Sequence, residues 1–288
     1  MMPSFLTKIS ICLLLLFIAG VHSQEGAQSF VATQDNGAWF LLTKEDLAGG
    51  THHTRHAEIF GKYVNGYNDY VLQGIDKVQA TAREGGGYFI GVKALPAESP
   101  VGYPLQLFGR PLLAPPRTTS YCSGASYAAF IEQLNLLFQG SRDSLDYTRY
   151  EALRMQEEDG GRREDTVKFW GKWNDDGFGG HYALVQYAQM GKEIKPRNAR
   201  PGDFMNISWK KGAGHSVIFL GWHKDESGQK NIVYWASQTR TNGFGDEVIP
   251  LDRIKEVKAI RLTSPKNLFN FDVATPVRRD IPGDVIDW

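Results

Sequence analysis

The sequence contains little cysteine: its 288 residues include only Cys12 and Cys122. Cys12 lies in an N-terminal apolar run that we expect to be removed, so Cys122 would be the only thiol of the mature chain. A single thiol excludes an internal disulfide and a structural zinc site built from paired cysteines. A thiol kept in an exported chain is normally either buried and inert or used in chemistry. Cys122 is therefore either a core residue or a nucleophile.

Net charge is also missing, since 32 basic and 32 acidic side chains balance. Nothing in this composition attracts a polyanion, so we expect no nucleic-acid partner. After residue 23 no apolar run approaches the roughly 18 residues that a membrane helix requires. We therefore do not expect an integral membrane protein once any N-terminal signal is removed.

The first 23 residues have the pattern of a signal peptide. Lys8 precedes an apolar run, and small residues follow near Ser23. The alternative is an uncleaved anchor, while a lipoprotein is disfavoured because Cys12 lies inside the run. We expect a secreted or periplasmic protein, monomeric after cleavage.

The full sequence has the composition of a globular protein, with 42% apolar and 22% charged residues. No repeat or low-complexity linker divides it. We expect an N-terminal, mostly helical extension over residues 24–110, a catalytic domain over 111–264 and a tail over 265–288, with a separate small N-terminal domain as the alternative.

Apolar spacing predicts the helices. Steps of three and four residues predict one long helix or two over residues 56–83, and a largely apolar helix follows over 122–138, with Cys122 in its first turn. Residues 181–190 are also expected to be helical. Extended pieces are expected at 38–42, 88–92 and 105–113.

The C-terminal half has strand character. Strands are expected over residues 204–209, 215–222, 231–237 and 257–262, separated by turn residues. The order of helices first and antiparallel strands second predicts an α+β fold, with a central helix bearing Cys122 packed on an antiparallel sheet.

A nucleophilic cysteine needs a basic histidine within hydrogen-bond reach and a third group to orient the imidazole ring. A helix N-terminus favours the thiolate form. His52, His53 and His56 lie in a polar stretch that is typical of a solvated segment, and His181 and His223 have the sequence context of surface residues. His215 opens the apolar strand HSVIFLGW after a flexible turn. It is therefore the preferred base.

Three motifs together resemble the NlpC/P60 and CHAP peptidases, which have a papain-like fold. They are Cys-Ser-Gly at 122–124, Pro-Gly-Asp at 201–203 and the run that begins at His215, and the resemblance covers residues 115–262. Two departures are Tyr121, where many relatives have Asp, and the long interval between Cys122 and His215.

The resemblance implies a catalytic triad. Cys122 would be the nucleophile, His215 the base, and Gln238 or Ser237 the third member. Alternation along the strand places Tyr234, Ala236 and Gln238 on one face and Trp235 and Ser237 on the other. We choose Gln238, because a side-chain amide supplies a carbonyl oxygen that accepts the imidazole N–H.

The implied reaction is hydrolysis of an amide through a thioester, without a metal or organic cofactor. The oxyanion would be bound by the Cys122 backbone N–H and by a second donor among Thr119, Ser120 and Tyr121. Peptide or peptidoglycan is the expected substrate, and general proteolysis is the alternative.

Further substrate contacts are expected from residues beside the triad and from an aromatic loop. Tyr121 and Ser237 neighbour triad residues. Trp170 and Trp173, with Phe178 and Tyr182, would line a narrow cleft, or would instead pack the loop against the central helix. Three other functional classes are possible: a metal enzyme, which the absence of HExxH spacing disfavours, an acyltransferase on the same fold, and a non-catalytic module that binds glycan or peptide.

Overall fold

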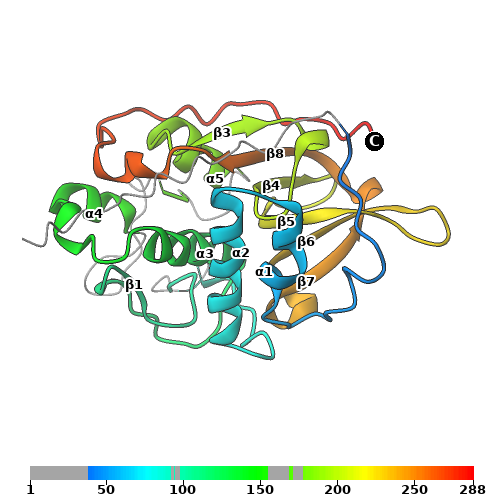
Figure 1. The fold of residues 1–288 in the computed structure, drawn as a ribbon, viewed down its shortest axis with the longest axis horizontal. Helices are drawn as coiled ribbons and strands as arrows, with labels where there is room; N and C mark the ends of the chain where they lie inside the picture. Colours follow the sequence, from blue (N-terminus) through cyan, green and yellow to red (C-terminus); the bar gives the residue numbers. More distant parts are fainter. Residues whose placement is uncertain (1–37, 92–93, 95–97, 155–168, 171–177) are drawn as a thin grey trace, which may run out of the picture. The chain divides into compact units, whose positions relative to one another are not determined.

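A computed structural model describes residues 38–91, 94, 98–154, 169–170 and 178–288 (Figure 1). The predicted signal peptide and Trp173 lie outside the described residues. The helices are α1 (His56–Phe60), α2 (Tyr67–Ala80), α3 (Cys122–Leu137), α4 (Tyr147–Leu153) and α5 (Gly179–His181). The strands are β1 (Leu105–Leu107), β2 (Arg110–Leu113), β3 (Gly191–Ile194), β4 (Phe204–Trp209), β5 (His215–Lys224), β6 (Lys230–Gln238), β7 (Gly243–Pro250) and β8 (Ile254–Leu262).

Six of these strands form one antiparallel sheet in the order β3-β8-β4-β5-β6-β7. The predicted strands at 204–209, 215–222, 231–237 and 257–262 are all present. β7 was not predicted, because residues 239–245 have turn composition, and the chain reverses there in the 3-10 turn Thr239–Thr241. The protein is thus α+β with antiparallel sheets, as the order of elements predicted.

Helix α3 is close to the predicted span, and the helical pattern over 56–83 divides into α1 and α2. Helix α2 crosses α3 in Figure 1, and the two pack directly. Gly74 allows this close approach, because a Cβ at that position would lie 2.6 Å from the Ala129 carbonyl oxygen on α3. One glycine therefore sets the separation of the two helices.

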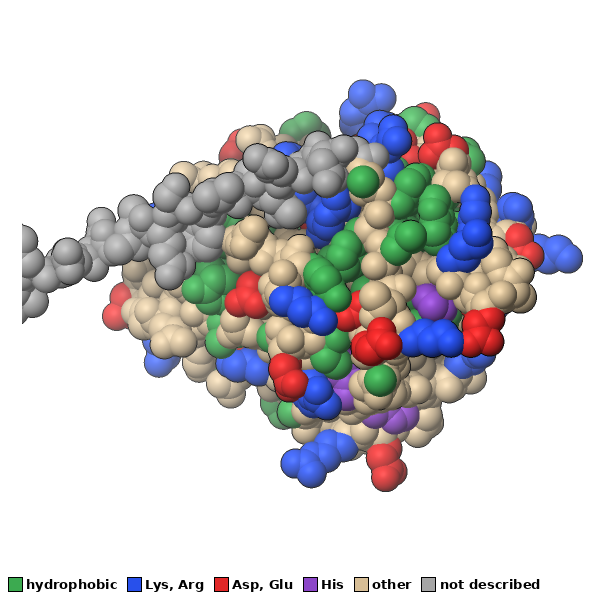
Figure 2. All heavy atoms as spheres, turned by 45° about the vertical axis from the view of Figure 1, so that its right-hand side comes forward, with side chains coloured by type: hydrophobic (Ala, Val, Ile, Leu, Met, Phe, Trp, Pro, Cys, Tyr) green, Lys and Arg blue, Asp and Glu red, His purple; other side chains and the backbone are tan. Residues whose placement is uncertain are grey.

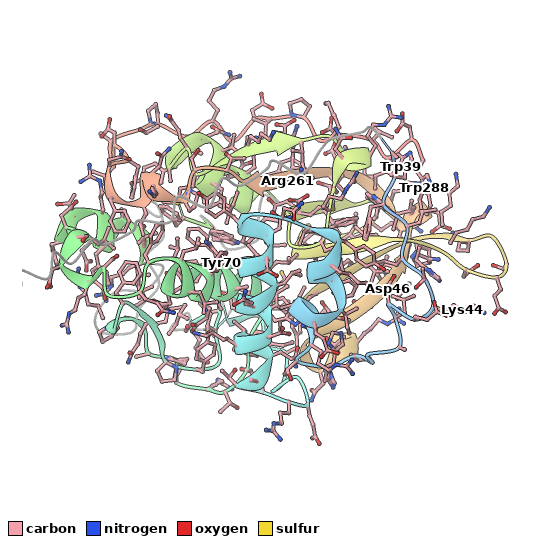
Figure 3. All side chains as sticks on the ribbon, in the orientation of Figure 1. Trp39, Lys44, Asp46, Tyr70, Arg261 and Trp288 are labelled. Carbon is pink, nitrogen blue, oxygen red and sulfur yellow. The ribbon has the colours of Figure 1, made fainter. Side chains whose placement is uncertain are left out.

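The sheet has a hydrophobic core on each face. One core contains Val71 of α2, Phe130 of α3 and Trp235 of β6. The other contains Val217 and Tyr234, and near it Trp39 packs 5.8 Å from Trp288 at the opposite end of the chain (Figure 3). The described residues before β1 and after β8 therefore share these cores with the sheet, and the described part of the chain forms one compact unit.

Three segments differ from the sequence expectation. Residues 181–190 begin as α5 and continue as a π-helical turn over Tyr182–Tyr187, and residue 191 opens β3. Residues 88–91 form only an isolated bridge, between Tyr88 and Ser120, and residues 38–42 likewise contribute one bridge, between Leu41 and Trp222. The 105–113 piece is the hairpin β1-β2.

Among the described residues, no helix combines the length and the apolar content that a bilayer crossing requires. On the face drawn in Figure 2, basic and acidic side chains are interspersed, as the balanced composition would suggest.

Candidate active site

The Pro-Gly-Asp motif has a structural role in this protein. Gly202 has φ of +86° in the turn before β4, and Asp203 is completely buried. The Asp203 carboxylate accepts hydrogen bonds from the Arg261 guanidinium on β8 at 2.9 and 2.7 Å and from the Asn68 side chain of α2 at 2.8 Å. The motif therefore ties helix α2 to two strands of the sheet and carries no group toward the candidate site.

Cys122 is the first residue of α3 and is 0% exposed. It forms no disulfide. The residue before it, Tyr121, is the extended N-cap of the helix, and the third residue of the motif, Gly124, lies under the Pro100 backbone, where a Cβ would come within 1.7 Å of the carbonyl oxygen. The Cys-Ser-Gly motif thus allows a loop to cross the first turn of the helix.

His215 is the first residue of β5 and is 7% exposed. Its Nε2 lies 3.4 Å from Oε1 of Gln238, the last residue of β6. Burial lowers the pKa of His215 to about 4, and the hydrogen bond with Gln238 opposes that shift. The imidazole is therefore neutral at pH 7.

The amide of Gln238 is held in one orientation. Its Nε2 donates to Thr241 Oγ1 at 2.8 Å and to the Gly245 carbonyl oxygen at 3.1 Å. A carbonyl oxygen only accepts, so the atom facing His215 is the amide oxygen, and His215 Nε2 carries the hydrogen. In the neutral ring, the other nitrogen, Nδ1, is then a proton acceptor.

A pocket of about 290 Å³ opens beside this pair. Its lining includes side chains from the four strands β4, β5, β6 and β7 and from the segment after α2. The residues are Tyr88, Ile90, Trp209, Ala213, Gly214, His215, Tyr234, Gln238, Thr239, Arg240, Glu247, Ile249 and Arg253. Arg240 Nε lies 3.0 Å from Glu247 Oε1, and burial raises the pKa of Glu247.

Two pocket tyrosines connect the pocket to Cys122. Burial raises the pKa of Tyr88, and the electrostatic interaction with Cys122 raises it further. Burial, Glu247 and then Cys122 raise the pKa of Tyr234 in the same direction. The Tyr234 ring also meets the His215 ring edge-on, with centroids 5.5 Å apart. The thiol therefore lies close enough to two lining residues to act on their ionisation.

The remaining sequence-predicted contacts are placed differently. Ser237 is completely buried on the face of β6 opposite to Gln238. Its hydroxyl shares a hydrogen bond of 2.8 Å with the hydroxyl of Ser120. Tyr121 is also fully buried. Alternation along β6 had predicted this division of Ser237 from Gln238, and neither Ser237 nor Tyr121 offers an exposed surface to a substrate.

The aromatic cleft also requires correction. Trp170 is 1% exposed, packs on Phe130 of α3 at 5.2 Å, and donates from Nε1 to Ser126 Oγ at 2.7 Å. Phe178 and Tyr182 are buried as well. Trp170 therefore follows the alternative interpretation, in which the loop packs against the central helix. The aromatic side chains that line the observed pocket are instead Tyr88, Trp209 and Tyr234.

Two of the suggested oxyanion donors are already used. The Ser120 backbone N–H donates to the Gly87 carbonyl and the Tyr121 N–H to the Pro100 carbonyl, both at 3.2 Å. The histidines of the N-terminal polar stretch also differ from the expectation of a solvated segment, because His56 is completely enclosed. His181 is likewise buried, with Nε2 3.0 Å from Glu193.

Comparison of the chain with protein-family models found no match, and comparisons with curated proteins and with solved structures found none either.

Proposed function

We propose that this protein is an exported thiol hydrolase with a papain-like core of the NlpC/P60 kind. Cys122 is the nucleophile, His215 the base and Gln238 the residue that orients the imidazole. The observation that carries the proposal is the His215–Gln238 pair, in which the fixed amide leaves Nδ1 as the acceptor. The position of Cys122 at the start of α3 supports it, because the helix N-terminus favours a thiolate.

The proposed reaction begins with transfer of the Cys122 thiol proton to His215 Nδ1. The thiolate sulfur attacks an amide carbonyl carbon, and the C–N bond breaks as the imidazolium donates its proton to the leaving amine. Water then attacks the thioester, His215 accepts a proton from that water, and the carboxylic acid leaves as the thiol is restored. Gln238 keeps its hydrogen bond to Nε2 throughout.

The environment of His215 keeps the ring unprotonated, and the low pKa makes it a weaker base than a free imidazole until a thiolate forms beside it. Its lowered pKa, about 4, leaves the ring unprotonated at neutral pH, and the ring can accept the thiol proton. When Cys122 becomes a thiolate, its negative charge stabilises the imidazolium that forms. A low pKa in the free protein is therefore compatible with an ion pair during the reaction.

We further propose peptide bonds of the cell wall as the substrate. The motif resemblance, the predicted signal peptide and the balanced charge favour an extracytoplasmic amide over a nucleic-acid ligand. The pocket contains Arg240, Glu247 and Arg253 beside three aromatic rings, which suits a short peptide with both charges. General proteolysis is the second candidate, and a silent binding module is the third.

Peptide release tests the substrate. Purified protein beginning at Gln24 should release soluble peptides from peptidoglycan and leave unfolded casein largely uncut, and Cys122→Ala should release nothing. Digestion of casein alone would overturn the substrate proposal and keep the thiol mechanism. Inactivity on both substrates, with binding retained, would favour the binding module.

Thiol labelling tests the nucleophile independently of any substrate, which matters because Cys122 is buried. Iodoacetamide should alkylate Cys122 in the folded protein at neutral pH, and His215→Ala should slow that labelling. Labelling that begins only when the protein unfolds would instead identify Cys122 as an inert core residue.

A further inference from the structure

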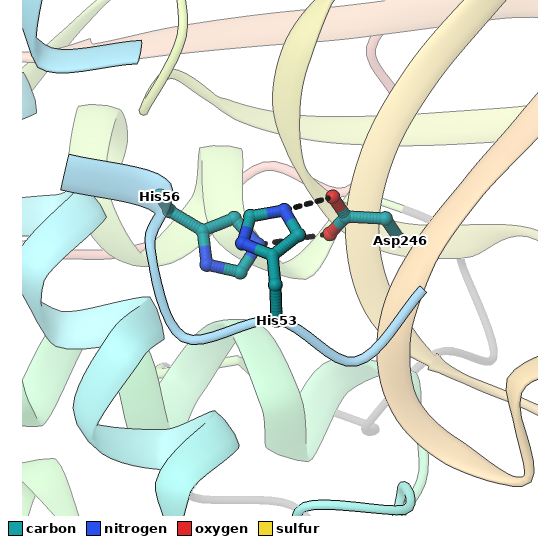
Figure 4. A group of neighbouring side chains, drawn as sticks. All are labelled: His53, His56 and Asp246. Carbon is teal, nitrogen blue, oxygen red and sulfur yellow. Dashed lines mark hydrogen bonds and ion pairs between the residues drawn. The ribbon is translucent and has the colours of Figure 1, made fainter. Parts of the chain in front are cut away.

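A cluster of two histidines and one aspartate lies where the loop before α1 meets β7. Its residues are not part of the lining of the His215 pocket. His53 Nε2 lies 3.1 Å from Asp246 Oδ2, and His56 Nε2 lies 2.9 Å from Asp246 Oδ1 (Figure 4). The two rings stack with centroids 4.1 Å apart and an angle of 26° between their planes. Both Nε2 atoms therefore point at one carboxylate.

The spacing of these three side chains is suited to one metal ion. One ligand atom from each residue lies within 4.8 Å of the other two. Ligands that share a tetrahedral ion at about 2.0–2.2 Å are themselves about 3.2–3.6 Å apart. Small rotations of the two rings would therefore open the present contacts into a coordination shell, with a water molecule as a fourth ligand.

The surroundings also resemble those of a metal ligand. The Nδ1 of His56 donates to Asp76 Oδ1 at 2.7 Å, and Asp76 is itself held by the backbone N–H groups of His56 and Ala57. A carboxylate that receives the second ring N–H is the usual device for orienting a metal-binding histidine. The side chains of His56 and His53 are 0% and 6% exposed, which shields the site from bulk water.

We propose that His53, His56 and Asp246 form a binding site for one divalent transition-metal ion, with Zn²⁺ as the preferred ion and Asp76 as the residue that orients His56. Two imidazole nitrogens and one carboxylate oxygen suit zinc, whereas calcium and magnesium prefer shells of oxygen. The site is independent of the proposed hydrolase activity, since its three residues do not line the His215 pocket.

Binding requires a defined change in protonation. In the metal-free cluster both nitrogens of His56 face carboxylates, so the ring donates from both, and the Nε2 proton must leave to solvent. His53 Nδ1 accepts from the Arg55 backbone N–H at 3.1 Å. When His53 Nε2 binds the metal, the ring hydrogen must move from Nε2 to Nδ1. Nδ1 then no longer accepts from the Arg55 backbone N–H, and water accepts that hydrogen bond instead, because Arg55 is exposed. Both changes leave neutral imidazoles, which are the forms that bind zinc.

An ion here would fasten the N-terminal loop to β7 close to Gln238. The Asp246 backbone N–H donates to the Thr51 carbonyl at 2.8 Å, and the adjacent Gly245 carbonyl receives a hydrogen bond from the Gln238 amide. The expected consequence is structural: a ligand that binds only the folded state raises its melting temperature.

Calorimetric titration of the purified protein tests the site. The titration should use the Cys122→Ser background, because the Cys122 thiol is itself a potential zinc ligand. One Zn²⁺ should bind per chain and raise the melting temperature, while Ca²⁺ and Mg²⁺ should do neither. His53→Ala should lose this binding, and Asp76→Asn should weaken it about 10- to 100-fold at unchanged stoichiometry.

The matched control is His52→Ala. His52 is the neighbour of His53, but its Nε2 lies 2.8 Å from the Thr241 carbonyl oxygen and it is not part of the cluster. His52→Ala should bind Zn²⁺ as the background protein does, and circular dichroism should show that each variant is folded without metal.

Cobalt gives a second readout. Co²⁺ bound at this site should produce the visible absorption of a tetrahedral nitrogen and oxygen shell, and Asp246→Asn should abolish it. Two results would overturn the proposal: no stoichiometric binding of Zn²⁺ or Co²⁺ by the background protein, or equal loss of binding in His52→Ala and His53→Ala. The first would leave the cluster as a purely structural ion-pair network.

Discussion

His56 and His215 are both enclosed by protein, but their surroundings drive their ionisation in opposite directions. Burial lowers the pKa of each ring. At His56 the charges and hydrogen bonds of Asp246 and Asp76 outweigh that effect and raise the pKa to about 9, whereas His215 has only the neutral Gln238 amide and its pKa falls to about 4. Burial alone therefore does not fix the charge of a histidine, and the partners that neighbouring elements supply decide it.

The difference separates two roles. A neutral imidazole can accept a proton, while an imidazolium between two carboxylates holds segments together. Asp246 and Gln238 lie on the adjacent strands β7 and β6, and Gly245, the residue before Asp246, pairs with Ala236 on β6. Two adjacent strands of one sheet thus supply a partner to each histidine, and α2 supplies His56 with a second one, Asp76.

The largest expected effect concerns activity at the neutral histidine. His215→Ala should lower the rate of amide hydrolysis about 10²- to 10⁴-fold, because general acid–base catalysis contributes about that much. Steady-state kinetics with a peptide substrate would measure it, and circular dichroism would verify the fold. The matched His56→Ala variant should retain more activity in any molecules that remain folded. Equal activity of the wild type and His215→Ala would remove the triad.

The second effect concerns stability, and here the substitution of His56 should have a larger effect than that of His215. His56→Leu should destabilise the metal-free protein by about 3 kcal/mol, because it leaves two largely buried carboxylates without their cation. His215→Leu removes one long hydrogen bond to a neutral group and should cost about 1 kcal/mol at pH 7. Urea unfolding of both variants would compare them. A larger loss in His215→Leu would contradict the assigned charge states.

Acid unfolding sharpens the comparison at His215 alone. The folded-state pKa, about 4, lies below the unfolded value of 6.5, so the unfolded state binds the proton more readily. The contribution of the neutral ring to the free energy of unfolding is therefore fully present above pH 6.5. It is lost as the pH falls toward 4, by up to about 3 kcal/mol. His215→Gln should flatten the stability profile between pH 6.5 and 4. An unchanged slope in that window would show that the ring is not held neutral.

The smallest expected effect concerns Gln238. Gln238→Ala should lower activity about 10-fold, less than His215→Ala, because the amide only orients the ring. Gln238→Glu offers the same acceptor geometry with a negative charge, and it should raise the pKa of His215 and shift the acid limb of the pH–rate profile upward. Measurement of that profile distinguishes orientation from a general loss of packing, which would leave the limb in place.

The sequence predicted much of the framework from short-range pattern. The spans of α3, β4, β5 and β6 follow from apolar periodicity and turn residues, which report on local burial. The alternation of Gln238 and Ser237 on opposite faces of β6 also follows from the two-residue period of a strand, and the structure has it so. The roles of Cys122, His215 and Gln238 remain predictions.

The substrate contacts assigned from sequence were less successful. Trp170 is typical of a cleft aromatic by composition, but its position against Phe130 is set by the packing of the loop on α3, which no local pattern encodes. Tyr88, Arg240 and Glu247 line the pocket although they come from separate segments. The 3-10 turn after β6 brings β7 back beside it, and turn composition alone did not reveal that strand.

The sequence by itself therefore determined the α+β order of elements and the placement of His215 and Gln238 at strand ends. Only the tertiary structure decided which histidines are charged. Asp246 lies 190 residues from His56 along the chain, and their contact depends on the pairing of β7 with β6 and on the packing of the N-terminal loop against that edge. Ionisation depends on distances between such remote groups, and these distances are fixed only when the chain has folded.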